Sequence, residues 1–260
     1  MEVSDLFDNY NRRARLYPAL LTLLPFLSTV LAWFPDLLTG SAGAALLTVV
    51  NACGLLYLLA ELSRSQGQRI QRKLLDRWGG FPTTRMLRHG DTALSSPLKA
   101  RYHAFLSERT QMPLPTAVEE VADLLAADAR YSSALDWLRE QSRGSDHALV
   151  LNENISFGFR RNLLGMKGWG VLLCAVSLIW PIAVIAIHYD WDQGAKIPEL
   201  FDTLERLEPV HVGAVILAII TLAAWIWVVT DVWVKEAADN YARRLLASCD
   251  VLAARGSAAV

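Results

Sequence analysis

The segment WGVLLCAVSLIWPIAVIAIH, residues 169–188, contains no acidic, lysine or arginine side chain, and its only histidine is the last residue. An α-helix rises about 1.5 Å per residue, so a segment of about 20 residues matches the ~30 Å hydrocarbon core of a bilayer. Lipid offers no hydrogen bonds to an open backbone, whereas a helix satisfies its own amides and carbonyls. The segment therefore predicts a membrane-spanning helix.

Three further segments share this apolar character. Hydrophobic residues make up 53% of the 260 positions and the mean hydropathy is +0.27, which is more apolar than is usual for a soluble protein. No segment contains lysine or arginine, and no alternating strand pattern is present. We predict an all-α integral membrane protein with four transmembrane helices and a helical cytoplasmic domain between the second and third. The spans are residues 16–34, 41–62, 169–188 and 210–234.

Basic residues flank the predicted spans on one side of the membrane. Because lysine and arginine are retained on the cytoplasmic side, both termini and the segment between the second and third spans are expected in the cytoplasm. The clusters are Arg12, Arg13 and Arg15; Arg64, Arg69, Arg72 and Lys73; Arg160, Arg161 and Lys167; and Lys235, Arg243 and Arg244.

These features divide the chain into five predicted parts. They are a cytoplasmic N-terminal segment (1–15), a transmembrane hairpin (16–62), a cytoplasmic helical domain (63–166), a second transmembrane hairpin (167–234) and a cytoplasmic C-terminal helix and tail (235–260).

Local signals place helix boundaries within the predicted cytoplasmic domain. Gly79 and Gly80 end one helix, Thr83 or Thr84 caps a short helix through Leu87, and Ser96 caps the next, with proline at its first position. A Thr-x-x-Glu capping box opens a further helix that is expected to run from residue 116 to about 143. Its apolar residues at helical spacing are Val121, Leu124, Leu125, Leu135 and Leu138.

Charge is divided unevenly within this domain. Residues 62–109 contain ten lysines and arginines against three acids, whereas residues 110–155 contain three against eight. Arginine forks and flat aromatic rings suit phosphate and base contacts, although pairing between the two halves is an equally good explanation of the arginines. The residues predicted to bind an anionic ligand are Arg85, Arg88, His89, Lys99, Arg101 and His103.

Catalytic chemistry has little support. His89, Asp91 and His103 are the candidates, but the spacing of a zinc site and a recognisable nucleophile elbow are both missing. Cys53, Cys174 and Cys249 are widely separated and form no metal-binding pair. We expect neither an enzyme nor a cofactor.

Polar residues in or beside the spans are sparse. Thr48, Asn51 and Asp231 are the candidates for an oligomer interface or a pore constriction, because an amide in hydrocarbon needs a partner. A local hydrogen bond within one subunit explains Asn51 equally well. The spans lack the mid-membrane charges of a proton-coupled transporter.

Three blocks resemble the membrane effectors of Hailong-type bacterial anti-phage defence systems: RWGGFPTTRMLRHGD (77–91), KARYHAFL (99–106) and ENISFGFRRNLLGMK (153–167). That family implies an oligomeric channel of the bacterial inner membrane, which a single-stranded DNA oligomer made by a partner nucleotidyltransferase holds closed. Loss of the oligomer then depolarises the membrane and arrests growth. The resemblance implies a homo-oligomer, expected to be a tetramer, and places the DNA on the six residues predicted above.

Two functions therefore follow from the sequence. The first is the DNA-gated channel. The alternative is a non-conducting membrane anchor whose acidic helix, residues 116–143, recruits a soluble partner.

Overall fold

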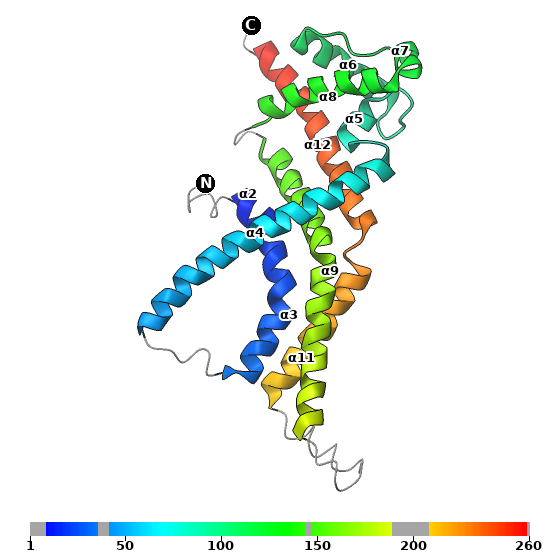
Figure 1. The fold of residues 1–260 in the computed structure, drawn as a ribbon. Helices are drawn as coiled ribbons and strands as arrows, with labels where there is room; N and C mark the ends of the chain where they lie inside the picture. Colours follow the sequence, from blue (N-terminus) through cyan, green and yellow to red (C-terminus); the bar gives the residue numbers. More distant parts are fainter. Residues whose placement is uncertain (1–8, 36–41, 144–146, 189–207, 259–260) are drawn as a thin grey trace. The chain divides into compact units, whose positions relative to one another are not determined.

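In the computed structural model the described residues are 9–35, 42–143, 147–188 and 208–258, with the backbone alone described for 9, 42–53, 185, 188 and 256–258. Every regular element among them is a helix, which confirms the all-α prediction. The helices shown in Figure 1 are α2 (Asn9–Asn11), the π-helix η1 (Arg12–Leu16), α3 (Tyr17–Trp33), α4 (Ala42–Trp78), α5 (Pro82–Leu87), α6 (Ser96–Thr110), α7 (Ala117–Ala122), α8 (Leu124–Gln141), α9 (Ala148–His188), α11 (Pro209–Trp227) and α12 (Asp231–Ala258).

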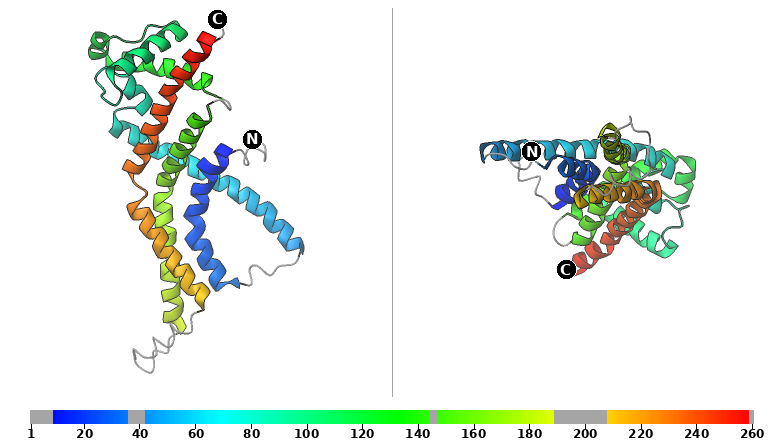
Figure 2. Two further views of the ribbon diagram at one scale, coloured as in Figure 1. Left: turned by 180° about the vertical axis from the view of Figure 1, so that it is seen from behind. Right: turned by 90° about the horizontal axis from the view of Figure 1, so that it is seen from below.

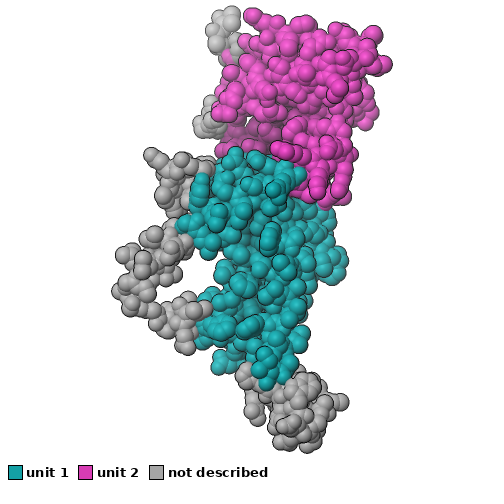
Figure 3. Space-filling model, in the orientation of Figure 1, with its two compact units in different colours: residues 1–69, 159–230 teal, residues 70–158, 231–260 magenta. Residues whose placement is uncertain are grey.

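The chain forms two compact units, which Figure 3 colours separately. Unit 1 comprises Met1–Arg69 and Phe159–Thr230, and unit 2 comprises Ile70–Gly158 and Asp231–Val260. Two long helices, α4 and α9, contribute residues to both units.

Three helices in the described part of the chain are long and apolar enough to cross a bilayer: Arg12–Trp33, Ala148–Val184 and Pro209–Trp227. They indicate a membrane-embedded protein and overlap the first, third and fourth predicted spans. The second predicted span, 41–62, begins outside the described residues, and its side chains as far as residue 53 are not described. That span stays a prediction.

Many apolar side chains of the three candidate spans face away from the protein. At most 33% of each apolar window is buried within the chain, and Ile179 and Ile220 are 62% and 60% exposed. A continuous apolar surface of this kind is unfavourable in water, whereas lipid tails solvate it without cost. The outward faces therefore fit a bilayer environment.

The fourth apolar segment is interrupted, contrary to the prediction of one helix over 210–234. The α11 helix ends at Trp227, and α12 begins at Asp231. Val228 and Val229 are β-branched and fit a helix less well, and the carbonyl of Val229 accepts a hydrogen bond from Nζ of Lys167 at 2.8 Å. Hydropathy could not reveal this break, because it counts composition and not the fate of single carbonyls.

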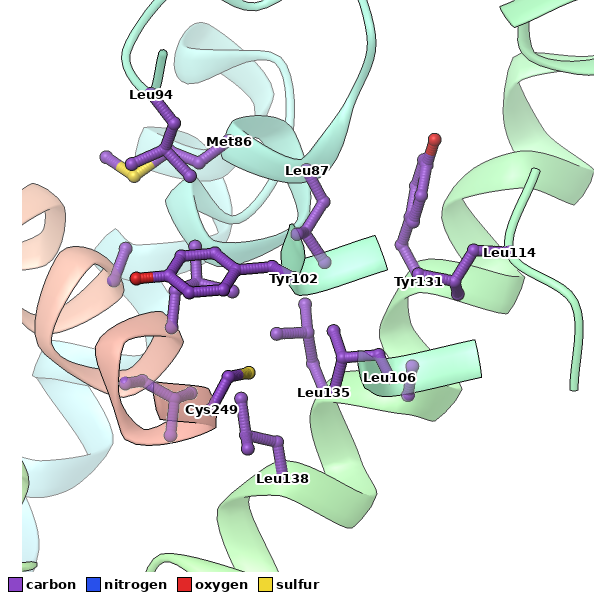
Figure 4. Close-up of a cluster of buried hydrophobic side chains, with 14 of the residues drawn as sticks. Met86, Leu87, Leu94, Tyr102, Leu106, Leu114, Tyr131, Leu135, Leu138 and Cys249 are labelled. Atoms are coloured by element: carbon purple, nitrogen blue, oxygen red, sulfur yellow. The ribbon is translucent and has the colours of Figure 1, made fainter. Parts of the chain in front are cut away.

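Unit 2 has a hydrophobic core to which α5, α6, α8 and α12 contribute, and these helices lie side by side in Figures 1 and 2. Figure 4 shows Tyr102 of α6 among Leu87 of α5, Leu135 of α8 and Cys249 of α12. The C-terminal helix thus completes the core of a segment that lies far from it in sequence. Its buried contributions are Ala242, Leu245, Leu246 and Cys249.

The start of α5 differs from the prediction. Phe81 occupies the N-cap position and makes no side-chain cap, and Pro82 fills the first turn. Proline presets the helical φ angle there, so Thr83 and Thr84 fall inside the helix, where both are buried. The two predicted caps are therefore wrong. The α6 helix likewise has its N-cap one residue earlier than predicted, at Ser95.

The capping box predicted at residue 116 is confirmed, since the Thr116 hydroxyl and the Glu119 side chain each bond the other's backbone. The single helix predicted behind it is two helices. Asp123 leaves helical geometry (φ −148°, ψ 92°), and its carboxylate accepts a hydrogen bond from the amide of Ala126 at 3.0 Å. An aspartate that starts a second helix therefore divides α7 from α8.

Candidate functional site

The residues predicted to bind an oligonucleotide all lie in unit 2. Five of them surround the loop of residues 88–91 that follows α5, and the rings of His89 and His103 meet edge to face there, with centroids 5.0 Å apart. The sixth, Arg101, contacts α12 instead. The five are Arg85, Arg88, His89, Lys99 and His103.

Lys99 holds this loop together. Its side chain is buried, and its ammonium donates to the main-chain carbonyls of Arg88, His89 and Asp91. An ammonium has three donors, so these carbonyls occupy all of them. Lys99 closes the loop and offers no donor to a ligand in this arrangement.

The two arginines beside the loop are paired with acids of unit 2. Nε of Arg88 donates to Asp128 at 2.9 Å, and its Nη2 donates to the second oxygen of the same carboxylate. This fork-to-fork geometry is the strong form of an arginine–carboxylate pair. Nε of Arg85 lies 3.1 Å from Asp91, and its Nη2 lies 3.5 Å from Asp239. A phosphate would have to displace these carboxylates.

Glu120 is a buried, hydrogen-bonded carboxylate at this loop that was not predicted from the sequence. The backbone amide of His89 donates to its Oε2 at 2.9 Å, and the hydroxyl of Tyr131 donates to the same oxygen at 2.8 Å. The amide of Gly90 lies 3.5 Å from the other oxygen. Glu120 therefore ties the loop to α7 and α8. Its position directly after the capping-box glutamate gave no signal of burial.

The two histidines bond main-chain carbonyls. Nε2 of His89 lies 2.9 Å from the carbonyl of Pro115, and Nε2 of His103 lies 2.8 Å from that of Leu87. A carbonyl only accepts, so each Nε2 carries the hydrogen. Burial lowers the pKa of His103, and nearby His89 lowers it further. His103 is thus held neutral and acts as a structural donor.

The pKa of Glu120 shifts in the direction that its contacts predict. Burial raises this pKa, but the hydrogen bonds from His89, Tyr131 and Gly90 outweigh it, so the pKa lies below its ordinary value of 4.5. A charged, buried carboxylate that accepts three hydrogen bonds holds its partners in place. Glu120 therefore has a structural role in this loop.

Arg101 differs from the other five residues. Its Nη2 lies 2.9 Å from Asp250, and the side chains are 62% and 45% exposed. Water screens a pair of this kind strongly, so an incoming phosphate can compete with Asp250. Arg101 is the most exposed of the three arginines predicted to bind the ligand, since the side chains of Arg85 and Arg88 are 21% and 17% exposed.

An apolar surface lies at the junction of α7 and α8. Helical spacing of its apolar residues predicted a helix there but not their exposure. Val118, Val121 and Leu125 are 79%, 88% and 83% exposed, and Leu124 is 45% exposed. Only farther along α8 do Leu135 and Leu138 enter the core, each at 0% exposure. We call Val118, Val121, Leu124 and Leu125 the α7 face.

The residues predicted for a pore or oligomer interface are less informative. Thr48 and Asn51 belong to the stretch of α4 whose side chains lie outside the described residues. Asp231 is the first residue of α12 and forms an ion pair with Arg77, which also belongs to unit 2.

No family model, curated protein or solved structure matches this chain. Across the described residues, no three histidine, cysteine, aspartate or glutamate side chains are grouped closely enough to hold a metal ion. The site must therefore be interpreted from its own geometry.

Proposed function

We propose that this chain is a membrane-anchored docking protein, in which apolar helices hold the molecule in a bilayer and unit 2 recruits a soluble partner protein through the α7 face. The observation that carries the proposal is the exposure of Val118, Val121 and Leu125, at 79%, 88% and 83%, which exceeds that of every other large apolar side chain described in unit 2. Clustered, exposed apolar side chains are a feature of interaction sites. This is the membrane-anchor alternative derived from the sequence.

The charges around the α7 face favour a basic partner. Glu119 and Asp123 flank its apolar residues, and both are exposed; Glu119 also pairs with Arg130 at 3.1 Å, so a basic partner would compete with Arg130 there. An amphipathic partner helix with apolar residues on one side and lysine or arginine beside them would match both features. The apolar side chains of the partner helix would pack against the valines and leucines of the α7 face. The flanking charges of Glu119 and Asp123 would set the orientation of the partner.

Site-specific crosslinking tests this recruitment. We expect a photo-crosslinking residue at Val121, in membranes of the native host, to trap one soluble protein through a basic, apolar peptide. Binding of that purified protein should weaken at least tenfold in Val121→Asp, because a carboxylate would enter an apolar contact. A matched crosslinker at exposed Ser133 should trap nothing. Trapping of a second copy of this chain at Val121 instead would contradict the proposal.

The finer topology is part of the same proposal. Four spans would place both termini and unit 2 in the cytoplasm of a bacterial inner membrane, as the flanking lysines and arginines favour. Alkaline phosphatase fused after residue 38, between the first two predicted spans, should then be active, because this topology would put that position in the periplasm. The same fusion after residue 143 should be inactive. Activity of the second fusion would show unit 2 on the opposite side.

The DNA-gated channel is the second proposal. It is supported by the resemblance to the Hailong-type effectors and by the exposure of Arg101. It ranks second because Arg85 and Arg88 already pair with acids of unit 2. Arg101→Glu should weaken binding of a single-stranded DNA oligomer and lower the salt dependence, by about 0.7 in the slope of log affinity against log salt for each lost phosphate contact. Unchanged affinity and slope would remove Arg101 from the site.

Conduction would need a path between subunits. Hydroxyls of the described spans bond their own helix: Thr22 donates to the Pro18 carbonyl at 2.7 Å, and Ser177 donates to that of Leu173 at 2.8 Å. A ring of Thr48 and Asn51 side chains in a tetramer is the proposed constriction. Liposomes containing the purified protein should then conduct ions once the oligomer is removed, whereas the docking proposal predicts no conductance.

A further inference from the structure

Three arginines from three helices of unit 1 lie near one another, and two of them flank the same carboxylate. Nη1 of Arg15, in η1, lies 3.6 Å from Glu61, and Nη1 of Arg64 lies 3.5 Å from the other oxygen of the same carboxylate in α4. Arg161 of α9 is within electrostatic reach of both arginines, which repel it. We call Arg15, Glu61, Arg64 and Arg161 the arginine cluster.

The cluster sits on a closely packed helix junction. The Asn162 side chain is fully buried and donates to the carbonyl of Ala14 at 2.7 Å, which joins α9 to η1. A Cβ on Gly67 would lie 1.9 Å from Oδ1 of Asn162, and one on Gly165 would lie 2.6 Å from the backbone of Gln66. Such close backbone approach fixes the helices that supply the arginines, so the cluster is preorganised.

The cluster has an unbalanced charge. Arg15 and Arg64 share the single carboxylate of Glu61, and both ion pairs are longer than a hydrogen bond. Nε of Arg161 and its Nη2 donate to Oδ1 of Asn162, at 3.1 and 3.0 Å. One turn before Arg15, Nε of Arg12 is buried and has no hydrogen-bond partner among the described residues. Arg15 and Arg64 thus carry one positive charge more than Glu61 offsets, and Nε of Arg12 is an unused donor.

We propose that the arginine cluster binds the phosphate group of an anionic phospholipid. Arg15 lies at the start of one candidate span, and the other two arginines follow or precede predicted spans on the same expected side of the membrane. Guanidinium forks match phosphate oxygens, and basic pockets between transmembrane helices on the cytoplasmic side are suited to lipid head groups. Acyl chains would lie against the outward apolar faces of the spans. This site is independent of the α7 face.

Lipid titrations of the purified full chain in detergent test the proposal. We expect phosphatidylglycerol to bind more tightly than phosphatidylcholine by native mass spectrometry. Each arginine near an anionic lipid contributes about fivefold in affinity, so Arg15→Gln with Arg64→Gln should weaken phosphatidylglycerol binding about 25-fold. Arg64→Gln alone, which changes a partly exposed side chain, should weaken phosphatidylglycerol binding about fivefold. This single variant tests the site if the double variant fails to fold.

The matched control is Arg69→Gln with Arg72→Gln, which removes the same charge from two exposed positions of α4. It should keep the affinity within about twofold. Equal weakening by the control pair would overturn the site, because it would show only diffuse attraction to a basic surface. Binding of inorganic phosphate at the same affinity as the lipid, lost in the double variant, would overturn the lipid assignment in favour of a soluble phosphate.

Discussion

Lys99 illustrates how a buried charge is used at the scale of one residue. Three carbonyls converge on it from a short loop, and the carbonyl groups would face each other without a cation between them. In sequence the same lysine is one of ten basic residues in a positive segment. Charge counting could not tell a residue that binds a ligand from one that closes a loop, since that distinction depends on which carbonyls the fold brings near.

Lys99→Met should therefore destabilise unit 2. Methionine keeps the apolar stem but leaves buried carbonyls without donors, which costs about 2 kcal/mol and lowers the Tm by about 4–8 °C. Thermal unfolding in detergent measures the change. Lys73→Met, at an exposed position of α4, should shift the Tm by less than 1–2 °C. A Tm for Lys99→Met equal to that control would show that the loop does not depend on the ammonium.

His103 provides a pH dependence of known sign. Burial lowers its pKa below the ordinary value of 6.5, so the unfolded chain binds the proton more readily than the folded one. Its contribution is complete above about pH 6.5 and is lost as the pH falls below that value. The Tm of the wild type should drop more between pH 7.5 and 5.5 than that of His103→Gln. Parallel pH profiles for the two proteins would refute the assignment.

At the scale of elements, signals confined to a few residues predicted structure well. The capping box at Thr116 was found because its partners lie within one turn. The break at Asp123 was missed because Val121, Leu124 and Leu125 continue the helical spacing across it, and spacing alone does not report whether a residue finds a core. Here the first apolar turns remain exposed, and that exposure is what suggests a docking surface.

Asp123→Ala tests whether the break depends on its cap. Removing an N-cap carboxylate costs a helix about 1 kcal/mol, and the bond to the amide of Ala126 is the one that would be lost. We expect the Tm to fall by about 2–4 °C and amide exchange to accelerate in the first turn of α8. Ser133→Ala, at an exposed position within α8, should leave both measurements unchanged. Unaltered exchange in Asp123→Ala would mean that packing, and not the cap, starts α8.

At the scale of the whole molecule, composition predicted an all-helical membrane protein because helix is the structure that apolar segments adopt in lipid. The partnership of α12 with α5, α6 and α8 was not predictable in the same way. Its core residues are small or unremarkable ones such as Ala242 and Cys249, and nothing local pairs them with a segment more than a hundred positions earlier. The predicted ligand site changed for the same reason, since the acids Asp239 and Asp250 that meet Arg85 and Arg101 come from α12.

In unit 1, α9 packs against α11 through a glycine, and two glycines two positions apart in α9 differ in whether they take part in this contact. A Cβ on Gly170 would lie 2.2 Å from the ring of buried Trp225, whereas one on Gly168 would meet nothing within 4 Å. Gly170→Ala should cost about 1–3 kcal/mol through overpacking, and Gly168→Ala should gain about 0.5–1 kcal/mol because alanine favours a helix interior. The two variants share one helix and one chemical change, so helix propensity cancels between them. Thermal unfolding in detergent should move their Tm values in opposite directions, and a rise for both would mean that α9 and α11 do not pack through Gly170.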